Sequence, residues 1–544
     1  MKQDTHVSLK QFVFSLSQAL DLINPAMADH HKRVAYIALR VAEASGFTGR
    51  TKEDVVVAAA LHDIGGLSGQ RLGGLRAPDL KVRTAHVGYQ LLQKFKPFRV
   101  PANIVRFQHV AWAHGDNGEI DGKTVPMGSH IVHLANLVNS LVDRTRPMLA
   151  QADDLCDALM DRRGHVLVPD FVDAFLKVSG NEAFWLDLNA PNLLQLMSAR
   201  TPFSSIELDI DGLQDFAELL AQLIDFRSRF TATHSSGVAA SAATLAQLFG
   251  FPEADCRRVQ VAGYLHDLGK LAIPTELLEK QGKLTDAEWQ TVRTHPYYTY
   301  QILASIEGLS DIACWSGMHH ERLRGTGYPF RASHAEIPLE ARILTVADVF
   351  TALTEDRPYR DGLDQRAVLG IIEEMVERFE VDRKVYQVLK NNYEVVDCSR
   401  VAAQTAALSE YTNFMEGLTA LDLSTARAAH VAWKRRLRSY LDGRGTLAVS
   451  LAGDHRQCDL GCWYYGDGLR RYGHLPEMRE LEKPHAEFHR LIGSLVDHLE
   501  RQEQGEAEAC YARIEPLSDR IVELLQNIEV KATSALVDEP AALH

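Results

Sequence analysis

Apolar side chains recur at intervals of three and four residues along most of the chain. The spacing is clear in VAYIALRVAEAS (residues 34–45), AELLAQLIDFRSRF (217–230) and EKPHAEFHRLIGSLVDHLERQ (482–502). This period places the apolar side chains on one face of an α-helix, whereas runs that alternate as in a β-strand are scarce. The pattern therefore predicts an all-α protein.

The helical pattern occurs twice in the first two-thirds of the chain. HHKRVAYIALRVAEASGF (30–47) aligns with HSSGVAASAATLAQLFGF (234–251), and a His-Asp pair follows each at the same separation, in LHDIGG and LHDLGK. Matched spacing over so many positions predicts two copies of one helical domain, copy one at 1–200 and copy two at 201–400. The stretches LDLNAPNLL and SARTPFSS are the expected linker between them.

Length and charge limit the classes of function. A chain of 544 residues is too long for one hydrophobic core, so we expect about three domains, the last at 415–535. The net charge of −14 argues against binding polymeric nucleic acid through the overall field. No apolar stretch is long enough for a membrane span, and the start lacks a signal peptide, so the expected compartment is the cytoplasm. Seven cysteines make no disulfide framework.

Copy two gathers imidazole and carboxylate side chains from several helical segments. Any one of them alone is typical of a helix cap or a core residue, but together they outnumber the ligands of one four-coordinate ion. Asp267 directly follows His266, so its carboxylate can bridge two ions, as in two-metal hydrolysis. The predicted ligands are His234, His266, Asp267, His295, His319, His320 and Asp348.

The motifs HDLGK, HP, HHE, GTGYP and VADVFTALTEDRPYR occur in the order typical of the HD-GYP family, which residues 220–395 resemble. The resemblance implies a two-metal centre, with iron or manganese favoured, that hydrolyses cyclic di-GMP to linear pGpG and sometimes on to GMP. It implies catalytic roles for Asp267 and Lys270, the latter able to contact a phosphoryl oxygen. It also implies substrate contacts by Gly325, Gly327, Tyr328, Pro329, Arg357 and Arg360.

Two positions depart from the family pattern. Arg324 stands where the family usually has aspartate, which keeps open a preference for another cyclic dinucleotide such as cyclic GMP-AMP. Phe230 stands where some members have a glutamate for a third metal, so we expect two metals. The alternative from another class is a non-catalytic scaffold that responds to zinc or oxidants.

Copy one keeps only part of the ligand set. It retains His30, His62, Asp63, His86 and His109, but Gly66 replaces the lysine, Val110 the second adjacent histidine and Asn136 the aspartate. We therefore expect no two-metal hydrolysis there. Two readings stay open, a single bound ion or a purely structural partner for copy two.

The last part of the chain predicts a four-helix bundle with a zinc site. His485 and His489 are four residues apart and share a helix face, and His430 and Cys458 lie on other helices. Three imidazoles and one thiolate suit tetrahedral zinc. The motifs CDLGCWYYG and PHAEFH resemble the chemoreceptor zinc-binding family, which implies a cytoplasmic regulatory bundle that is often dimeric, so we expect a homodimer.

Cys462 stands where that family commonly has lysine. One hypothesis is an oxidant-driven disulfide between Cys458 and Cys462 that releases zinc, and the alternative is a packing role for Cys462. The sequence thus predicts two tandem HD-type domains followed by a four-helix zinc-binding bundle, and a phosphodiesterase regulated by zinc or redox state.

Overall fold

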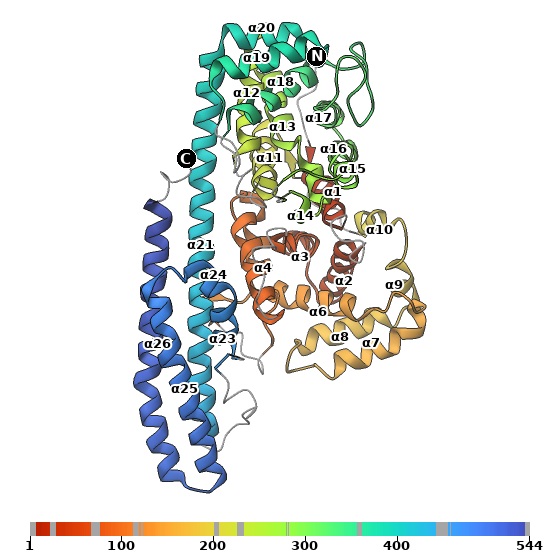
Figure 1. Cartoon of the computed structure of the whole chain (residues 1–544). Coiled ribbons are helices and arrows are strands. Elements are labelled where there is room, and N and C mark those ends of the chain that lie inside the picture. The colour runs from red at the N-terminus through yellow and green to blue at the C-terminus, as the bar shows by residue number, and fades with distance from the viewer. Residues whose placement is uncertain are drawn as a thin grey trace. The chain divides into compact units, whose positions relative to one another are not determined.

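The computed structural model describes residues 7–21, 29–66, 77–112, 119–120, 123–200, 206–225, 233–278, 280, 282–355, 362–441, 455–456 and 458–538. Helices make up nearly all of this regular structure, which confirms the all-α prediction (Figure 1). Two compact units divide the chain: the first unit is Met1–Ser68 with Thr84–Ser409, and the second unit is Gly69–Arg83 with Glu410–His544. None of the described helices is both long enough and apolar enough to cross a membrane.

Copy one begins with a short strand and is otherwise helical. Its elements are β1 (Val7–Ser8), α1 (Leu9–Asp21), α2 (His30–Ala44), α3 (Gly49–Ala60), α4 (Ala77–Leu92), η3 (Lys96–Phe98), α5 (Arg99–Arg106), β2 (Glu119–Ile120), β3 (Lys123–Thr124), α6 (Met127–Leu141), η4 (Met148–Gln151), α7 (Ala152–Met160), α8 (Pro169–Ser179), α9 (Glu182–Asp187) and α10 (Leu193–Arg200).

Copy two repeats the order of α1 to α3 in α11 to α13. Its elements are β4 (Glu207–Leu208), α11 (Ile210–Asp225), α12 (His234–Leu248), α13 (Glu253–Leu265), η5 (Leu268–Ala272), α14 (Thr275–Leu278), α15 (Asp286–Val292), α16 (His295–Ala304), α17 (Ser310–Gly317), α18 (Leu339–Thr354), α19 (Gln365–Glu377) and α20 (Arg383–Asn391). The strands form two antiparallel pairs, β1 with β4 and β2 with β3.

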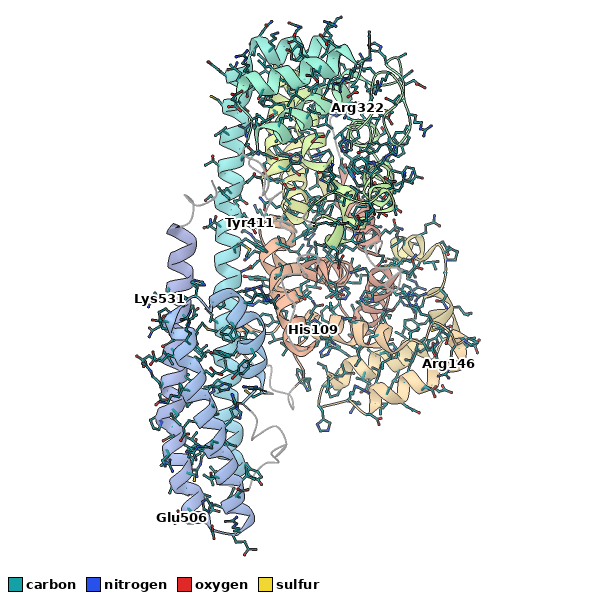
Figure 2. The ribbon with its side chains drawn as sticks, viewed as in Figure 1. His109, Arg146, Arg322, Tyr411, Glu506 and Lys531 are labelled. Carbon is teal, nitrogen blue, oxygen red and sulfur yellow. The ribbon has the colours of Figure 1, made fainter. Side chains whose placement is uncertain are left out.

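The second unit is built from long helices. It contains the end of α21 (Tyr393–Leu441), then α23 (Asp459–Trp463), a π-helical turn (Tyr464–Gly468), α24 (Leu469–Tyr472), α25 (Pro476–Glu500) and α26 (Gln504–Asp538). In Figure 2, Glu506 marks the start of α26, and Lys531 lies further along the same helix. Apolar side chains from these segments, among them Leu437, Trp463 and Phe488, form one buried core.

Small residues bring α12 and α13 together. A Cβ added to Gly263 would lie 2.5 Å from Ala239 Cα, so the two backbones are nearly in contact. Since His234 begins α12 and His266 follows the last residue of α13, this close packing brings the two imidazoles to 5.5 Å between ring centroids.

Phe216, on α11, joins the two copies through an aromatic cluster. Its buried ring lies 4.7 Å from that of Phe12 on α1, and 5.0 and 5.5 Å from those of Phe95 and Phe98. Ser15 and Ser305 add a hydrogen bond of 2.8 Å between α1 and the end of α16. The two copies therefore share a core within the first unit.

Replacing Phe216 by alanine leaves a cavity where the two copies meet. We expect Phe216→Ala to lower the free energy of unfolding of the first unit by about 3–5 kcal/mol. The shift of the denaturant midpoint, followed by circular dichroism, measures the effect. Leu186→Ala removes a side chain that is 55% exposed and is the control, with an expected change below about 0.5 kcal/mol. Equal shifts for the two variants would contradict the shared core.

Candidate functional site

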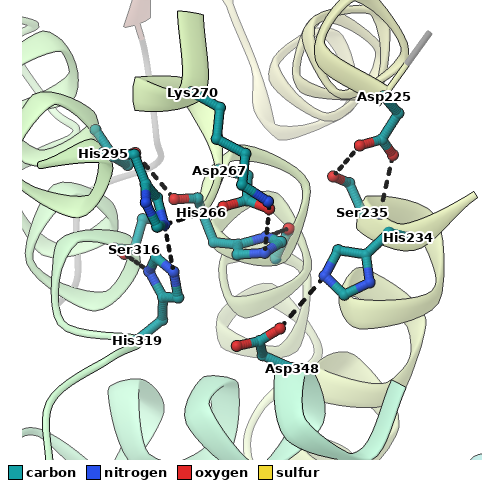
Figure 3. Close-up of polar contacts among 12 residues, drawn as sticks. Asp225, His234, Ser235, His266, Asp267, Lys270, His295, Ser316, His319 and Asp348 are labelled. Atoms are coloured by element: carbon teal, nitrogen blue, oxygen red, sulfur yellow. Dashed lines mark hydrogen bonds and ion pairs between the residues drawn. The ribbon is translucent and has the colours of Figure 1, made fainter. Parts of the chain in front are cut away.

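The predicted ligands of copy two come from the ends of its helices. His234 and His295 are the first residues of α12 and α16, and Asp267 lies between α13 and η5. Figure 3 shows Asp267 between the pair His295 and His319 on one side and the pair His234 and Asp348 on the other. The seven side chains are buried, apart from a half-buried His320, so five separate segments converge on one cluster of polar side chains.

The two oxygens of Asp267 face two different groups of imidazoles. Oδ2 lies 3.2 Å from His266 Nε2, and Oδ1 lies 3.3 Å from His295 Nε2. His295 Nε2 is in turn 3.4 Å from His319 Nε2. Metal-competent atoms form two sets, one of His234, His266 and Asp348 and one of His295, His319 and His320, and a third group of His266, Asp267 and His319 connects them. A carboxylate between two such sets has the arrangement of a bridging ligand.

Asp348 completes the first set and reaches toward the second. Its Oδ1 lies 3.3 Å from His234 Nε2, while its Oδ2 lies 3.8 Å from His320 Nδ1. Burial opposes ionisation of Asp348, but the facing imidazoles outweigh it and hold the pKa of the carboxyl well below its ordinary value. The pocket thus favours positive charge between these side chains.

Backbone carbonyls orient three of the imidazoles. The Nδ1–H groups of His266, His295 and His319 donate to the carbonyl oxygen three residues earlier, at 2.7, 2.7 and 2.6 Å. Each bond fixes the tautomer, so the lone pair on Nε2 points into the pocket. Burial and the neighbouring imidazoles lower the pKa of His319 to about 3, which keeps that ring neutral and able to bind a metal.

Glu355 orients the fourth imidazole, and our sequence analysis missed it. Its carboxylate lies 3.0 Å from His234 Nδ1 and also accepts a hydrogen bond of 2.6 Å from Gln404. Burial lowers the pKa of His234, but the carboxylates of Glu355 and Asp348 together outweigh burial and raise that pKa to about 10. The signal in the sequence was the position of Glu355, two helical turns after Asp348.

Lys270 lies beside the bridging carboxylate. Its ammonium forms an ion pair with Asp267 Oδ2. Burial would lower the pKa of the lysine, but Asp267 outweighs it and raises the pKa, so Lys270 stays cationic. The turn that carries Lys270 needs a glycine, because a Cβ on Gly269 would lie 1.9 Å from the carbonyl oxygen of His295.

Glu321 holds the loop that follows the adjacent histidines, a role that our sequence analysis did not assign. Its buried carboxylate accepts three backbone N–H groups, from Phe330 at 2.7 Å, Arg331 at 3.0 Å and Ala332 at 3.1 Å. Gly327 packs against the same residue, since an added Cβ would lie 2.4 Å from Glu321 Cα. A buried carboxylate and a close backbone approach therefore shape the GTGYP loop.

Within that loop, Gly325 and Tyr328 occupy distinct positions. Gly325 has φ +76°, in the left-handed region that favours glycine. The Tyr328 ring lies 5.0 Å from that of His320, and the guanidinium of Arg293 lies 4.6 Å from the Tyr328 ring centroid. Pro329 follows directly, so the loop brings an aromatic face next to the second ligand set.

Arg324 pairs with residues of its own neighbourhood. Its Nε donates to Thr326 Oγ1 at 2.8 Å, and its Nη2 forms an ion pair of 3.2 Å with Glu380. The arginine that replaces the family's aspartate thus meets a carboxylate of the same unit.

Several sequence predictions lie outside the described residues. They concern the substrate arginines Arg357 and Arg360, the third-metal position Phe230, and the side chain of Cys462.

Copy one brings together part of its predicted ligand set. His30 Nε2 lies 3.2 Å from His62 Nε2, and Asp63 lies beside both rings. His86 packs against Tyr89, with 5.8 Å between ring centroids, and His109 lies 6.5 Å from His133.

The second unit holds a cluster of three predicted zinc ligands. The ligand atoms of Cys458, His485 and His489 lie within 4.8 Å of one another, with Cys458 Sγ 3.2 Å from His485 Nε2. Burial and nearby imidazoles lower the pKa of His485 to about 2, so the ring is neutral. His430, the fourth predicted ligand, is buried with its Nε2 3.1 Å from Ser518 Oγ.

Models of known protein families match the parts of the chain that carry these clusters. Family models for the HD domain match residues 27–156 and 218–385, and the model for the chemoreceptor zinc-binding domain matches 430–496. The chain is therefore an HD-domain protein with two HD domains and a chemoreceptor zinc-binding domain. Its second HD domain carries the GTGYP loop.

The chain is similar to several proteins that are named as cyclic-dinucleotide phosphodiesterases. A 3'3'-cGAMP-specific phosphodiesterase of Vibrio cholerae is 28% identical over 71% of this chain and 92% of its own length. A cyclic di-GMP phosphodiesterase of Pseudomonas aeruginosa is 42% identical over 24% of this chain and 32% of its own length. The crystal structure of a cyclic GMP-AMP phosphodiesterase of V. cholerae covers 74% of this chain and 98% of its own, with a TM-score of 0.51 and 22% identity, which shows a shared fold.

Removing the carboxylate of Glu321 leaves three buried amides without their acceptor. We expect Glu321→Ala to destabilise the loop by about 2–4 kcal/mol, because hydrogen bonds to a buried charged group are among the stronger ones. Limited proteolysis between residues 322 and 336 measures the opening, with Glu377→Ala, which removes an exposed carboxylate at the end of α19, as the control. Glu321→Gln keeps an acceptor oxygen, and its expected effect is smaller. Equal cleavage of the alanine variant and the parent would contradict this role.

Proposed function

We propose that the chain is a metal-dependent phosphodiesterase that opens the ring of 3'3'-cyclic dinucleotides. Cyclic di-GMP is hydrolysed to linear pGpG, and cyclic GMP-AMP is the second candidate substrate. The observation that carries the proposal is the Asp267 carboxylate, whose two oxygens face two separate imidazole groups. The relative with 92% of its length covered acts on cyclic GMP-AMP, which favours the second substrate.

The donor atoms fit a pair of divalent ions. Ligand atoms about 2.0–2.2 Å from one ion lie about 3.0–3.5 Å apart. The separations of 3.2–3.4 Å around Asp267, His295 and His266 agree with that range. His234, His266 and Asp348 would hold one ion, His295, His319 and His320 would hold the other, and Asp267 would offer one oxygen to each. Imidazole and carboxylate donors favour iron or manganese.

Divalent ions held by these residues would supply positive charge to the phosphodiester and lower the pKa of a water molecule. In the hydrolysis, the water oxygen bonds to phosphorus, the bond from phosphorus to the ribose oxygen breaks, and a proton from the water ends on that ribose oxygen. Lys270 adds a fixed cationic charge beside Asp267, where charge builds up on the phosphoryl oxygens. Burial of the ligands keeps competing solvent away from the reacting atoms.

The GTGYP loop provides a cradle for the dinucleotide. Tyr328 offers an aromatic face to a base, and Gly325 and Gly327 allow the backbone to approach, with Pro329 stiffening the turn. Arg293 over Tyr328 and the buried Nη1 of Arg322, which lacks a hydrogen-bond partner among the described residues, add positive charge next to the loop. Two anionic phosphates suit this set of groups.

Arg324 acts on the loop and not on the choice of base. Its guanidinium forms a hydrogen bond with Thr326 and an ion pair with Glu380. We therefore expect residues other than Arg324 to discriminate between the two substrates, so that Arg324→Ala leaves the ratio of their kcat/KM values unchanged. The measurement is kcat/KM for each cyclic dinucleotide in the parent and in Arg324→Ala.

The second unit adds a regulatory zinc site to the proposed enzyme. Cys458, His485 and His489 are assigned to one zinc ion, with His430 as the fourth predicted ligand. A thiolate ligand makes the site sensitive to oxidants as well as to zinc supply. Homodimer formation through this unit is part of the same proposal.

Asp267→Asn removes the charge that joins the two metal sets. We expect turnover of both cyclic dinucleotides to fall by at least about 10³-fold, since an amide is a poor bridge between cations. Product chromatography of linear dinucleotides, with manganese or iron supplied, measures the loss. Asp311→Asn, which alters a side chain that is 60% exposed, is the matched control and is expected to keep parent activity. A parent chain that gives no linear product from either substrate would overturn the proposal and favour a binding scaffold.

His485→Ala removes one donor of the zinc cluster. We expect the full chain to lose about one zinc equivalent, because three remaining donors hold the ion more weakly than four. Metal analysis after dialysis against a mild chelator provides the measurement. His498→Ala, on the same helix and paired with Glu503, is the control and keeps the parent zinc content. If His485→Ala retains all of the zinc, the assignment is wrong.

A further inference from the structure

Copy one contains a compact cluster of four metal-competent side chains. Ligand atoms of His30, His31, His62 and Asp63 all lie within 4.8 Å of one another. They come from two places, the first turn of α2 and the residues directly after α3. The cluster includes His31, which has no ligand counterpart in copy two, where Ser235 follows His234.

The distances in this cluster match a tetrahedral site. His30 Nε2 and His62 Nε2 are 3.2 Å apart, and Asp63 Oδ2 lies 3.4 Å from the first and 3.2 Å from the second. Four ligands about 2.0–2.1 Å from a zinc ion lie about 3.3–3.4 Å apart at the corners of a tetrahedron. The three atoms therefore already form one face of such a site.

His31 is held as a metal-binding histidine is held. Its Nδ1–H donates to Asp21 Oδ1 at 2.6 Å, so the lone pair is on Nε2. The side chain is 2% exposed, and its Nε2 has no hydrogen-bond partner among the described residues. A buried imidazole nitrogen without a partner costs free energy. A carboxylate on the far nitrogen is the usual support of a metal-bound histidine.

Asp21 of copy one and Asp225 of copy two occupy equivalent positions but have different partners. Asp225 lies ten residues before Ser235, as Asp21 does before His31, and it accepts hydrogen bonds from Ser235 N at 2.9 Å and Oγ at 3.0 Å. The same buried carboxylate thus supports a serine in one copy and an imidazole in the other. The imidazole adds a donor in the copy whose Asn136 replaces the Asp348 carboxylate.

His62 and His30 are also oriented for this role. His62 Nδ1–H donates to the carbonyl of Ala59 at 2.8 Å, which directs its Nε2 into the cluster. The amide nitrogen Nδ2 of Asn139 lies 2.7 Å from His30 Nδ1, which accepts its hydrogen bond in this arrangement. A rotation of the amide by about 180° exchanges its nitrogen and oxygen, so that His30 Nδ1–H donates to the oxygen and the lone pair of Nε2 becomes available for a metal ion.

We propose that copy one holds a single divalent transition-metal ion of the zinc class, bound by His30, His31, His62 and Asp63. Asp21 is a positioning residue that acts through His31. Four protein ligands leave no open position for a substrate, so the ion is structural and ties the start of α2 to the end of α3. A second ion is not part of this site, because Val110 stands in the place of His320 and, among the described residues, neither His86 nor His109 joins a metal-competent group.

The test is a count of metal in the full chain. Parent protein and His31→Ser are stripped with chelator, loaded with zinc and separated from free zinc, and bound zinc is measured by mass spectrometry. His31→Ser restores the residue found in copy two, where serine pairs with the equivalent carboxylate, so the fold is expected to be retained. We expect the variant to bind about one zinc fewer per chain, because it lacks one of four donors. Circular dichroism verifies the fold.

His133→Ser, a substitution of another imidazole of copy one, is the matched control and keeps the parent zinc content. Asp21→Asn keeps all four ligands and is expected to weaken the affinity of this one equivalent about 10–100-fold, measured by competition with a zinc chelator. This variant decides the question if His31→Ser fails to fold. Equal zinc content and affinity in the parent and the folded variants would overturn the site, as would an equal loss in His133→Ser.

The result does not depend on the proposed phosphodiesterase. The readout is metal bound by copy one, and both hydrolysis by copy two and zinc in the second unit are left intact by these substitutions.

Discussion

A buried carboxylate shared between two groups of imidazoles is the constraint on which the arrangement of copy two depends. Asp267 is only 2% exposed, and burial alone would raise its pKa. His266 and Lys270 outweigh that effect and hold the pKa of Asp267 well below its ordinary value. A buried negative charge is stable only with such partners, so the helix ends that carry them must meet at this point. The close packing of α12 on α13 and the glycine at 269 allow these segments to approach one another.

The same local hydrogen bond orients four of the imidazoles that face metal-competent clusters. A histidine at or just past a helix end donates Nδ1–H to the carbonyl oxygen three residues earlier, as His62, His266, His295 and His319 do. The carbonyls at a helix end have no partner within the helix, so they are available to the ring. One hydrogen bond thus gives the carbonyl oxygen a partner and directs the lone pair of Nε2 toward the cluster.

The two copies show how one scaffold supports different sites. Both keep a buried aspartate at the end of the preceding helix, yet Asp225 binds a serine and Asp21 binds an imidazole. In copy two the donors spread into two sets around Asp267, whereas in copy one they contract into a single group. Substitutions at His31, Val110 and Asn136 account for the difference, because they add one donor to one group and remove donors from the other.

The sequence by itself determined the all-α class, the repeat, and the residue types that meet in each cluster, because helical period and motif spacing are local properties. It also identified Cys458, His485 and His489 before their convergence was visible. Only the tertiary structure revealed Glu355, Glu321 and Asp21, since each acts on a partner brought near by packing. The pairing of Arg324 with Glu380 has the same origin. Spacing along a chain predicts which groups can bind a metal, whereas the direction of each lone pair depends on hydrogen bonds between segments distant in sequence.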